Sequence, residues 1–285
     1  MLEMKQIIRT LEGVTDLPTL PTVYSKVSFL VNDSRTTAAQ VTKVIETDQA
    51  ITSKILRLVN SSFFGFSRRI SSIHQAVILL GFNTIRNTVL SVSAFKMFGT
   101  GSNGMFDLKN FWKHSIATGM LSKILGQYLE IDMDEEAFTA GILHDIGKLV
   151  LNKYFPVEFE KALKKTQQEK LVLFDAERQV IGVSHAKIGE YLVDRWNLPY
   201  GLVETIALHH TPGVLRSSPK LVSLVHVGNI FAREMQLGFN GDFRIPEIDP
   251  FVYEELETTE DELNGYYMRM KEEIDKNMEI FNILI

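Results

Sequence analysis

The amino-acid sequence predicts an all-α fold, a two-lobed helical bundle whose second lobe carries most of the chemically distinctive residues. Apolar residues recur at spacings of three and four along almost the whole chain, a period typical of amphipathic helices. No β-rich run of alternating residues is bounded by hairpin dipeptides, so we expect no strand. The chain has 285 residues, 45% of them hydrophobic. This length suffices for about two domains at roughly 150 residues each.

The composition excludes several classes of protein. The chain has no cysteine, so a disulfide framework, a thiolate metal site and a catalytic thiol are excluded, and any metal ion must be bound by histidine, carboxylate or amide groups. Charged residues interrupt the first eleven positions, and no apolar run approaches the ~18 residues of a membrane span. We therefore expect a cytoplasmic protein without membrane contact. The net charge of -5 argues against nucleic acid as a partner.

An N-terminal helical lobe is expected over residues 1–100. Residues 17–21 are expected to form its entry loop, because each proline there biases the preceding residue away from the helical conformation. A helix is expected to begin near Thr22. Asp48 is expected to cap a further helix over 49–60.

Two more helices are expected before the lobe ends. Ser71 or Ser72 caps the first of them, Gly81 ends it in the left-handed conformation, and the second runs over 83–98. Hydrogen bonds from the Asn60 side chain are expected at a helix end. The buried residues expected in this lobe are Ile51, Ile55, Leu56 and Leu79.

A linker rich in glycine and small polar residues, 99–104, is expected to separate the lobes. The second lobe is expected over 105–238, and the remaining segment, 239–285, is expected to be a loop and an amphipathic C-terminal helix. The helices expected in the second lobe cover 107–127, 135–153, 175–196, 200–210 and 219–236.

The C-terminal helix has a clear start and one apolar face. Thr259 and Glu262 have the spacing of a capping box. This face can dock on the body of the protein or on a second copy, so a homo-oligomer formed through the helix is one of two open alternatives. The face consists of Leu263, Tyr267, Met270, Ile274, Met278 and Phe281.

Histidines dominate the candidate chemistry, because six of the seven lie in the second half of the chain. His114 shares a helical face with apolar residues, so its imidazole is expected to be buried. His144 and Asp145 are adjacent on an expected helix, where an ion against the helix flank can contact both. His185 shares a face with Gly182 and Gly189, which would let a neighbouring helix approach closely.

Further candidates lie near the end of the second lobe. His209 and His210 end a helix, and Asn229 places an amide on an otherwise apolar stripe, with His226 nearby. The alternative is a set of unrelated buried or surface polar residues. Because five helices each contribute to this set, we favour a metal site with mixed nitrogen and oxygen ligands, suited to a divalent iron or manganese ion, with nickel and zinc as alternatives.

The order of these groups resembles that of known proteins. His114, His144-Asp145 with Gly147-Lys148, His185 and His209-His210 together resemble the HD superfamily of metal-dependent phosphohydrolases. Further motifs resemble the HDOD family, bacterial signal-transduction output domains related to these hydrolases, so that the resemblance covers about 17–232. These motifs are Leu17-Pro18-Thr19-Leu20-Pro21, Ile45-Glu46-Thr47-Asp48, Lys54-Ile55-Leu56-Arg57-Leu58-Val59-Asn60-Ser61, Ala76-Val77-Ile78-Leu79-Leu80-Gly81 and Trp196-Asn197-Leu198-Pro199.

The resemblance implies an N-terminal HDOD lobe, an HD-type second lobe and a particular set of metal ligands. By analogy with HD-GYP phosphodiesterases, which cleave cyclic di-GMP, the ligands are His114, His144, Asp145, His185, His209 and His210, with Asn229 at the closing position. This chain departs from that pattern in three places. Asn229 replaces an aspartate, Asn110 stands where some relatives have a glutamate, and Thr211-Pro212-Gly213 replaces the glycine-tyrosine-proline segment. Little or no cyclic di-GMP phosphodiesterase activity is therefore expected.

If catalysis is retained, a metal-activated water would attack phosphorus, and Asp145 would bridge or orient it. Lys148 would neutralise charge on the phosphoryl oxygens; its alternative is a solvated lysine near a helix end. Arg68 and Arg69 either bind an anionic ligand or partner, or are merely exposed.

Two functions follow, and a third is weaker. The favoured one is a regulatory signalling module that binds a signalling protein or a phosphorylated small molecule, with the metal serving structure or sensing. The other is a metal-dependent phosphohydrolase acting on a nucleotide or another phosphate ester, with Asp145 and Lys148 as its catalytic residues. Nucleic-acid binding would need a basic face that the composition does not indicate.

Overall fold

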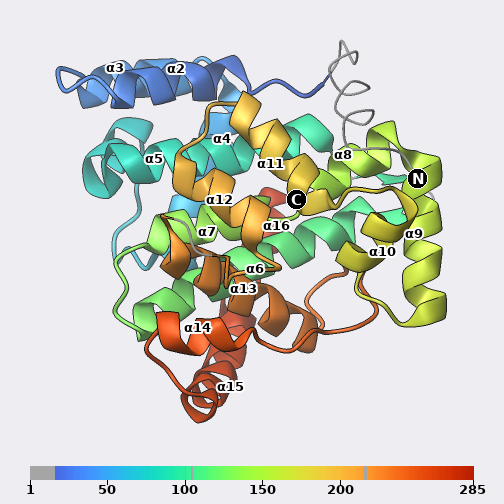
Figure 1. The fold of residues 1–285 in the computed structure, drawn as a ribbon. Helices are drawn as coiled ribbons and strands as arrows, with labels where there is room; N and C mark the ends of the chain where they lie inside the picture. Colours follow the sequence, from blue (N-terminus) through green and yellow to red (C-terminus); the bar gives the residue numbers. More distant parts are fainter. Residues whose placement is uncertain (1–16, 100, 104, 215–216) are drawn as a thin grey trace. The chain divides into compact units, whose positions relative to one another are not determined.

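The expected all-α architecture is confirmed. A computed structural model describes residues 17–99, 101–103, 105–214 and 217–285, and these fold mainly as helices joined by loops (Figure 1). Within the described ranges, the strands are one antiparallel pair of two residues each, β1 (Ser102–Asn103) and β2 (Phe106–Asp107). The part of the expected first lobe that precedes Leu17 lies outside the described residues.

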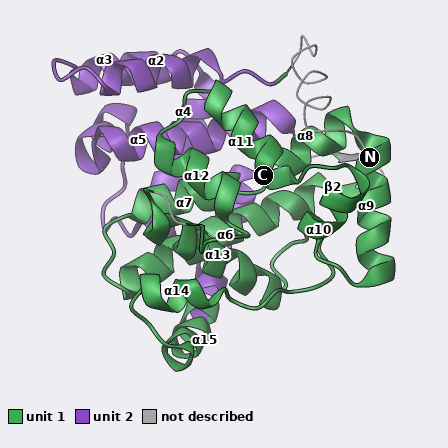
Figure 2. Cartoon of the chain, viewed as in Figure 1, with its two compact units in different colours: residues 1–17, 100–271 green, residues 18–99, 272–285 purple. Residues whose placement is uncertain are grey.

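The chain divides into two compact units (Figure 2). Unit 1 contains Thr100–Lys271 together with the N-terminal segment to Leu17, and unit 2 contains Pro18–Gly99 and Glu272–Ile285. The expected segment 239–285 is thus shared between the two units instead of forming a part of its own. The reason is contact: the main chain of Leu284 accepts a hydrogen bond from Lys54 Nζ at 2.7 Å, and α16 (Glu279–Leu284) packs on α4 (Gln49–Val59).

Unit 2 is built on helices whose ends were largely predictable. Its other elements are α2 (Thr22–Val31), α3 (Ala38–Ile45), the 3₁₀ turn η1 (Ser62–Phe64) and α5 (Ile73–Phe98). Asp48 caps α4, Ser72 caps α5, and Gly81 has φ 79° and interrupts α5 at the expected place. Helix α5 is long and apolar enough to cross a membrane by composition, but 56% of its most apolar window is buried inside the protein, as in the core helix of a folded domain.

The core of unit 2 agrees with the prediction in part. Ile51 and Ile55 are buried, and Asn60 makes the expected hydrogen bonds at the end of α4. Leu56 is only partly buried, and the prediction for Leu79 is wrong, since it is 52% exposed. Leu79 lies just before the interruption at Gly81, where the chain changes direction, so helical spacing alone does not fix which side faces inward.

Unit 1 contains more helices than the sequence predicted. Two expected helices are each divided into two, and α9 and α14 were not predicted. The elements are α6 (Leu108–Tyr128), α7 (Asp134–Leu143), α8 (Ile146–Tyr154), α9 (Pro156–Glu169), α10 (Leu173–Val180), α11 (His185–Arg195), α12 (Tyr200–Leu208), α13 (Pro219–Glu234), α14 (Pro250–Glu255) and α15 (Glu260–Lys276).

Both divisions occur beside candidate ligands. The chain leaves α7 at His144 and begins α8 after Asp145, so these residues lie at a junction between helices and not on the flank of one helix. Gly182, with φ 95°, ends the region of α10, and Ser184 then caps α11, which begins at His185. The prediction that Gly182 shares a helical face with His185 is therefore wrong.

Close approaches between helices hold the junctions in place. A Cβ atom on Gly147 would lie 1.9 Å from the carbonyl oxygen of His185, so α8 and α11 touch through backbone atoms. A Cβ on Gly141 would lie 2.4 Å from the Cα of Gly119, so α7 and α6 also approach closely. Only glycine permits such approaches.

The C-terminal helix is anchored within the chain itself. The Thr259 and Glu262 capping box is present, with reciprocal hydrogen bonds of 2.9 and 3.3 Å to the two backbone N–H groups. Four of the six expected face residues are buried; Tyr267 is partly exposed and Met278 is 43% exposed. The buried four are Leu263, Met270, Ile274 and Phe281.

Candidate metal centre

The histidines predicted as ligands converge with Asp145 in unit 1. One group of potential ligand atoms comes from Asp145, His185, His209 and His210, and a second from His114, His144 and Asp145. Within each group the atoms lie within 4.8 Å of one another. Asp145 belongs to both groups, so its carboxylate occupies the centre of the cluster.

The candidate ligands come from four places in unit 1. His114 lies in the second turn of α6, His144 and Asp145 lie between α7 and α8, and His185 begins α11. His209 and His210 follow α12, where Thr211 and Pro212 prevent its continuation. These side chains are buried apart from His210, which is partly exposed.

Three of the histidines are oriented by hydrogen bonds at Nδ1. His144 Nδ1 lies 2.7 Å from the carbonyl oxygen of Gly141, and His209 Nδ1 lies 3.0 Å from that of Ile206. His185 Nδ1 lies 2.7 Å from Oε2 of Glu177. Because carbonyl and carboxylate oxygens only accept, Nδ1 carries a proton in each ring, and in the neutral tautomer Nε2 presents a lone pair to the cluster. This is the usual support of a metal-binding histidine.

Several buried atoms at the centre lack ordinary partners. Among the described residues, Nε2 of His144, Nε2 of His209 and Oδ1 of Asp145 make no hydrogen bond. The two imidazole nitrogens nevertheless lie 3.2 and 3.6 Å from oxygens of the Asp145 carboxylate. Lone pairs that face a carboxylate in a buried site need positive charge between them. The donor set of imidazole nitrogens and one carboxylate therefore fits a divalent metal ion of the borderline class.

The protonation equilibria of His209, His114 and Asp145 agree with this arrangement, whereas the charge of Glu177 outweighs burial and raises the pKa of His185. Burial lowers the pKa of His209 to about 3 and that of His114 well below its usual value, so both rings are neutral near pH 7. Burial opposes ionisation of Asp145, but the neighbouring His144, Lys148 and His185 outweigh it and hold the pKa of Asp145 well below its usual range. A metal ion needs neutral imidazoles and an ionised carboxylate.

Lys148 is part of a buried ion network behind Asp145. Its Nζ lies 2.8 Å from Asp145 Oδ2 and 3.4 Å from Asp242 Oδ2, and the lysine side chain is fully buried. Arg233 completes the network at 2.7 Å from Asp242 Oδ2. The alternative of a solvated helix-end lysine is therefore wrong. In this position Lys148 orients the Asp145 carboxylate and compensates its charge.

Two amides close the site on the side of His114. Asn229 Oδ1 lies 3.1 Å from His114 Nε2, so the residue at the closing position contacts the cluster through its side chain. Asn240 Nδ2 donates to Asp145 Oδ2 at 3.0 Å and also lies 3.1 Å from His114 Nε2. His226 lies near the cluster but holds the backbone, since its Nδ1 lies 2.7 Å from the carbonyl oxygen of His209.

Four residues of this site were not predicted from the sequence. They are Glu177, Arg233, Asn240 and Asp242. Glu177 could have been noticed as a charge on the apolar side of a short helix, where it is fully buried. Asn240 and Asp242 belong to one short segment, in which the Asp242 backbone N–H donates to Asn240 Oδ1, and this segment lies beyond the expected lobe boundary at residue 238. Arg233 carries no distinguishing pattern.

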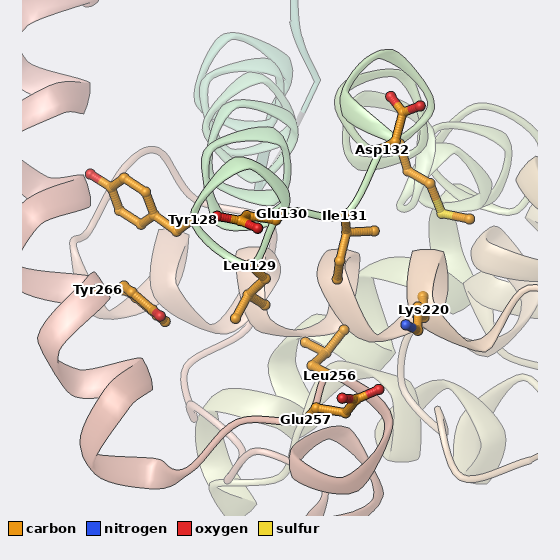
Figure 3. Close-up of a pocket in the computed structure, with 10 residues that line it drawn as sticks. Tyr128, Leu129, Glu130, Ile131, Asp132, Lys220, Leu256, Glu257 and Tyr266 are labelled. Carbon is orange, nitrogen blue, oxygen red and sulfur yellow. The ribbon is translucent and has the colours of Figure 1, made fainter.

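A cavity elsewhere in unit 1 contains none of these ligands. It has a volume of about 550 Å³, and its lining includes Glu130, Asp132 and Glu257 (Figure 3). Rings of Tyr128 and Tyr266 lie at one side, with centroids 5.3 Å apart. Three of its ten lining residues are acidic and exposed, which differs from the buried imidazole cluster.

The sequence matches the HDOD domain family over residues 17–212. The chain belongs to the HDOD family. The matched region includes the motifs of unit 2 and the cluster residues up to His210, whereas Asn229, Asn240 and Asp242 lie beyond it.

Similar proteins support the assignment of the fold. An HDOD domain protein with unknown function from Geobacter sulfurreducens is 26% identical, with a TM-score of 0.75 over 97% of this chain and 95% of that one. An inferred phosphohydrolase from Shewanella amazonensis SB2B is 23% identical, with a TM-score of 0.74 over 97% and 98% of the two chains, which shows a shared fold. An uncharacterized protein of Treponema pallidum (strain Nichols) is 26% identical over 227 residues, 78% of this chain but 43% of the relative, so this chain spans less than half of that protein's length.

Proposed function

We propose that this HDOD chain is a cytoplasmic regulatory module of signal transduction, in which a divalent metal ion stabilises unit 1. The observation that carries the proposal is the set of inward Nε2 atoms of His144, His185 and His209 around the buried Asp145 carboxylate. Iron and manganese suit this mixed ligand set, with nickel and zinc as alternatives. The module would act by binding a signalling protein or a phosphorylated small molecule.

Burial supports a structural or sensing role over catalysis. Asp145 and Lys148 are fully buried, so neither presents an exposed group to a substrate phosphate. Asn229 supplies a neutral oxygen where the related phosphodiesterases use a carboxylate, which weakens the hold on a second cation. Little or no hydrolysis of cyclic di-GMP is expected on both grounds.

A metal-dependent phosphohydrolase is the second candidate, and one observation favours it. Asp145 belongs to both ligand groups, and a carboxylate shared between two sites is suited to bridging two metal ions. Metal ions bound there would activate water and neutralise phosphate oxygens. Asp145 would then hold the ions, and Lys148 would keep its carboxylate ionised and oriented.

Metal analysis combined with a substrate screen separates these functions. The purified full chain is analysed for metals, loaded with Mn²⁺ or Fe²⁺, and assayed with p-nitrophenyl phosphate, bis-p-nitrophenyl phosphate and cyclic di-GMP. The module predicts bound metal without turnover. His144→Ala should lose the metal, whereas His74→Ala, which changes an exposed histidine of unit 2, should keep it. Turnover that disappears in Asp145→Asn would decide for the hydrolase, and a wild-type chain that binds no metal would refute both.

A further inference from the structure

Unit 2 contains a cavity of about 670 Å³ along one side of α4. All of its lining residues belong to unit 2, and they come from α4, its C-cap Asn60 and the segment 69–71. Ser53, Leu56 and Arg57 contribute from α4, and Arg69 and Ile70 from the opposite wall. The volume lies within the range of roughly 300–1,000 Å³ that small-molecule sites occupy.

Asn60 holds the two walls of this cavity together. Its Nδ2 donates to the carbonyl oxygen of Ile70 at 2.8 Å, and its Oδ1 accepts from the Ile70 backbone N–H at 2.8 Å. The same Nδ2 also donates to the carbonyl oxygen of Leu56 at 2.6 Å. The segment that carries Arg69 is therefore tied to the end of α4, so the two walls are arranged before any ligand binds.

The cavity is positively charged. Arg57 and Arg69 are both exposed, and neither forms an ion pair with another described residue. Residues 18–99 carry nine Lys and Arg against three Asp and Glu, although the whole chain has a net charge of -5. Unit 2 as a whole has ten basic and seven acidic side chains, and none of the acidic ones lines this cavity. Anions are therefore attracted to it.

We propose that this cavity binds a small phosphorylated molecule with an apolar part, of the nucleotide class. Two guanidinium groups and the Ser53 hydroxyl offer more donors than one carboxylate can accept, and they match the charge and the terminal oxygens of a phosphate group. Leu56 and Ile70 form an apolar floor, and the volume exceeds what phosphate alone fills. The site would give the module a ligand-binding function separate from the metal centre.

Calorimetric titration of the full chain with AMP, adenosine and inorganic phosphate tests this proposal. AMP should bind more tightly than either fragment, because only AMP engages both the arginines and the apolar floor. The variant R57Q/R69Q should weaken AMP binding by roughly tenfold or more. The matched control K26Q/K43Q removes the same charge from exposed lysines of unit 2 outside the cavity, and its affinity should remain within about twofold of the wild type.

Hydrogen exchange in the presence of AMP locates the binding. Slower exchange is expected over 49–60 and 69–71, with R57Q/R69Q abolishing the effect. The proposal is overturned if AMP does not bind at millimolar concentration, or if R57Q/R69Q binds it as well as the wild type does. It is equally overturned if the two double variants weaken binding alike, or if the cavity arginines instead retain DNA or an acidic peptide while AMP fails to bind.

Discussion

Glu177 and His185 are joined by two hydrogen bonds to one carboxylate oxygen. Oε2 of Glu177 accepts from the His185 backbone N–H at 2.6 Å and lies 2.7 Å from His185 Nδ1. The first bond satisfies a free N–H in the first turn of α11, and the second directs Nε2 of the ring toward Asp145, 3.0 Å from its Oδ1. A residue eight positions earlier in the chain thus determines how the ligand points.

Loss of this support should weaken metal binding. Glu177→Ala is expected to lower metal affinity by about 10–100-fold, measured by competition with a chelator, because the ring of His185 loses its orientation. Glu177→Gln should retain most of the affinity, since its amide oxygen can still accept. Glu190→Gln is the control, because this partly buried residue of α11 pairs with Lys187 and not with a cluster histidine, and it should leave metal affinity unchanged. Equal metal affinity in Glu177→Ala and wild type would refute the positioning role.

Lys148→Met should strongly destabilise unit 1. Removal of the ammonium group leaves the buried Asp145 without its lysine partner and Asp242 with Arg233 alone, and breaking such a network costs about 3–5 kcal/mol. Urea denaturation measures the loss, and excess Mn²⁺ should restore part of it by neutralising Asp145. Lys161→Met, at an exposed position of α9, is the control. A loss below 1 kcal/mol in Lys148→Met would show that the network contributes little.

Gly147→Ala should disrupt the junction that positions Asp145. The added Cβ would lie 1.9 Å from the His185 carbonyl oxygen, so α8 and α11 would have to separate. We expect a lower melting temperature and a lower metal content together. Gly265→Ala is the matched control, because a Cβ there meets nothing within 4 Å, and it should be neutral or stabilise α15 by up to roughly 1 kcal/mol. Equal melting temperatures of the two variants would refute the role of Gly147 at this junction.

Asn229→Asp should lower the melting temperature in the absence of metal and raise the affinity for metal. The new carboxylate beside His114 is buried, so in EDTA the variant is expected to melt at a lower temperature than the wild type. With Mn²⁺ or Fe²⁺ the same carboxylate becomes an anionic ligand, and metal affinity should rise. Thermal melting in both buffers checks the prediction, and a variant that is no tighter a metal binder would place residue 229 outside the coordination sphere.

Asp48 should make the stability of unit 2 dependent on pH. The hydrogen bond from Lys96, at 2.7 Å, is the main reason why the pKa of Asp48 is lowered, and burial opposes it only in part. Because the pKa is lower in the folded state, the stabilisation is complete above the ordinary value of 3.8 and is lost as the pH falls through the folded value. Asp48→Ala should cost about 1 kcal/mol at pH 7, mostly through the lost helix cap.

Urea denaturation at a series of pH values tests this dependence. The difference in stability between wild type and Asp48→Ala should shrink as the pH falls below 4. Asp48→Asn keeps a capping oxygen but not the charge, so it should lie between the two at pH 7 and show less variation with pH. A difference that stays constant down to pH 3 would mean that the ion pair does not contribute.

The all-α class, some of the helix caps and the identities of the candidate ligands could be predicted from the sequence. Each depends on local information: apolar periodicity, capping residues such as Asp48, or a histidine such as His114 on an otherwise apolar face. The set His114, His144-Asp145, His185 and His209-His210 was informative because polar side chains are rarely buried among apolar residues without a specific interaction.

Only the tertiary structure decided how these residues are held. The division of the expected helix 135–153 at His144 and Asp145 depends on the approach of Gly147 to His185 in another helix, which local propensity does not record. Glu177, Asn240 and Asp242 reach the site from segments distant in sequence, and their role depends on partners that folding brings together. Lys148 shows the same limit: its position near a helix end allowed a solvated side chain, but the two aspartates around it make a buried one stable.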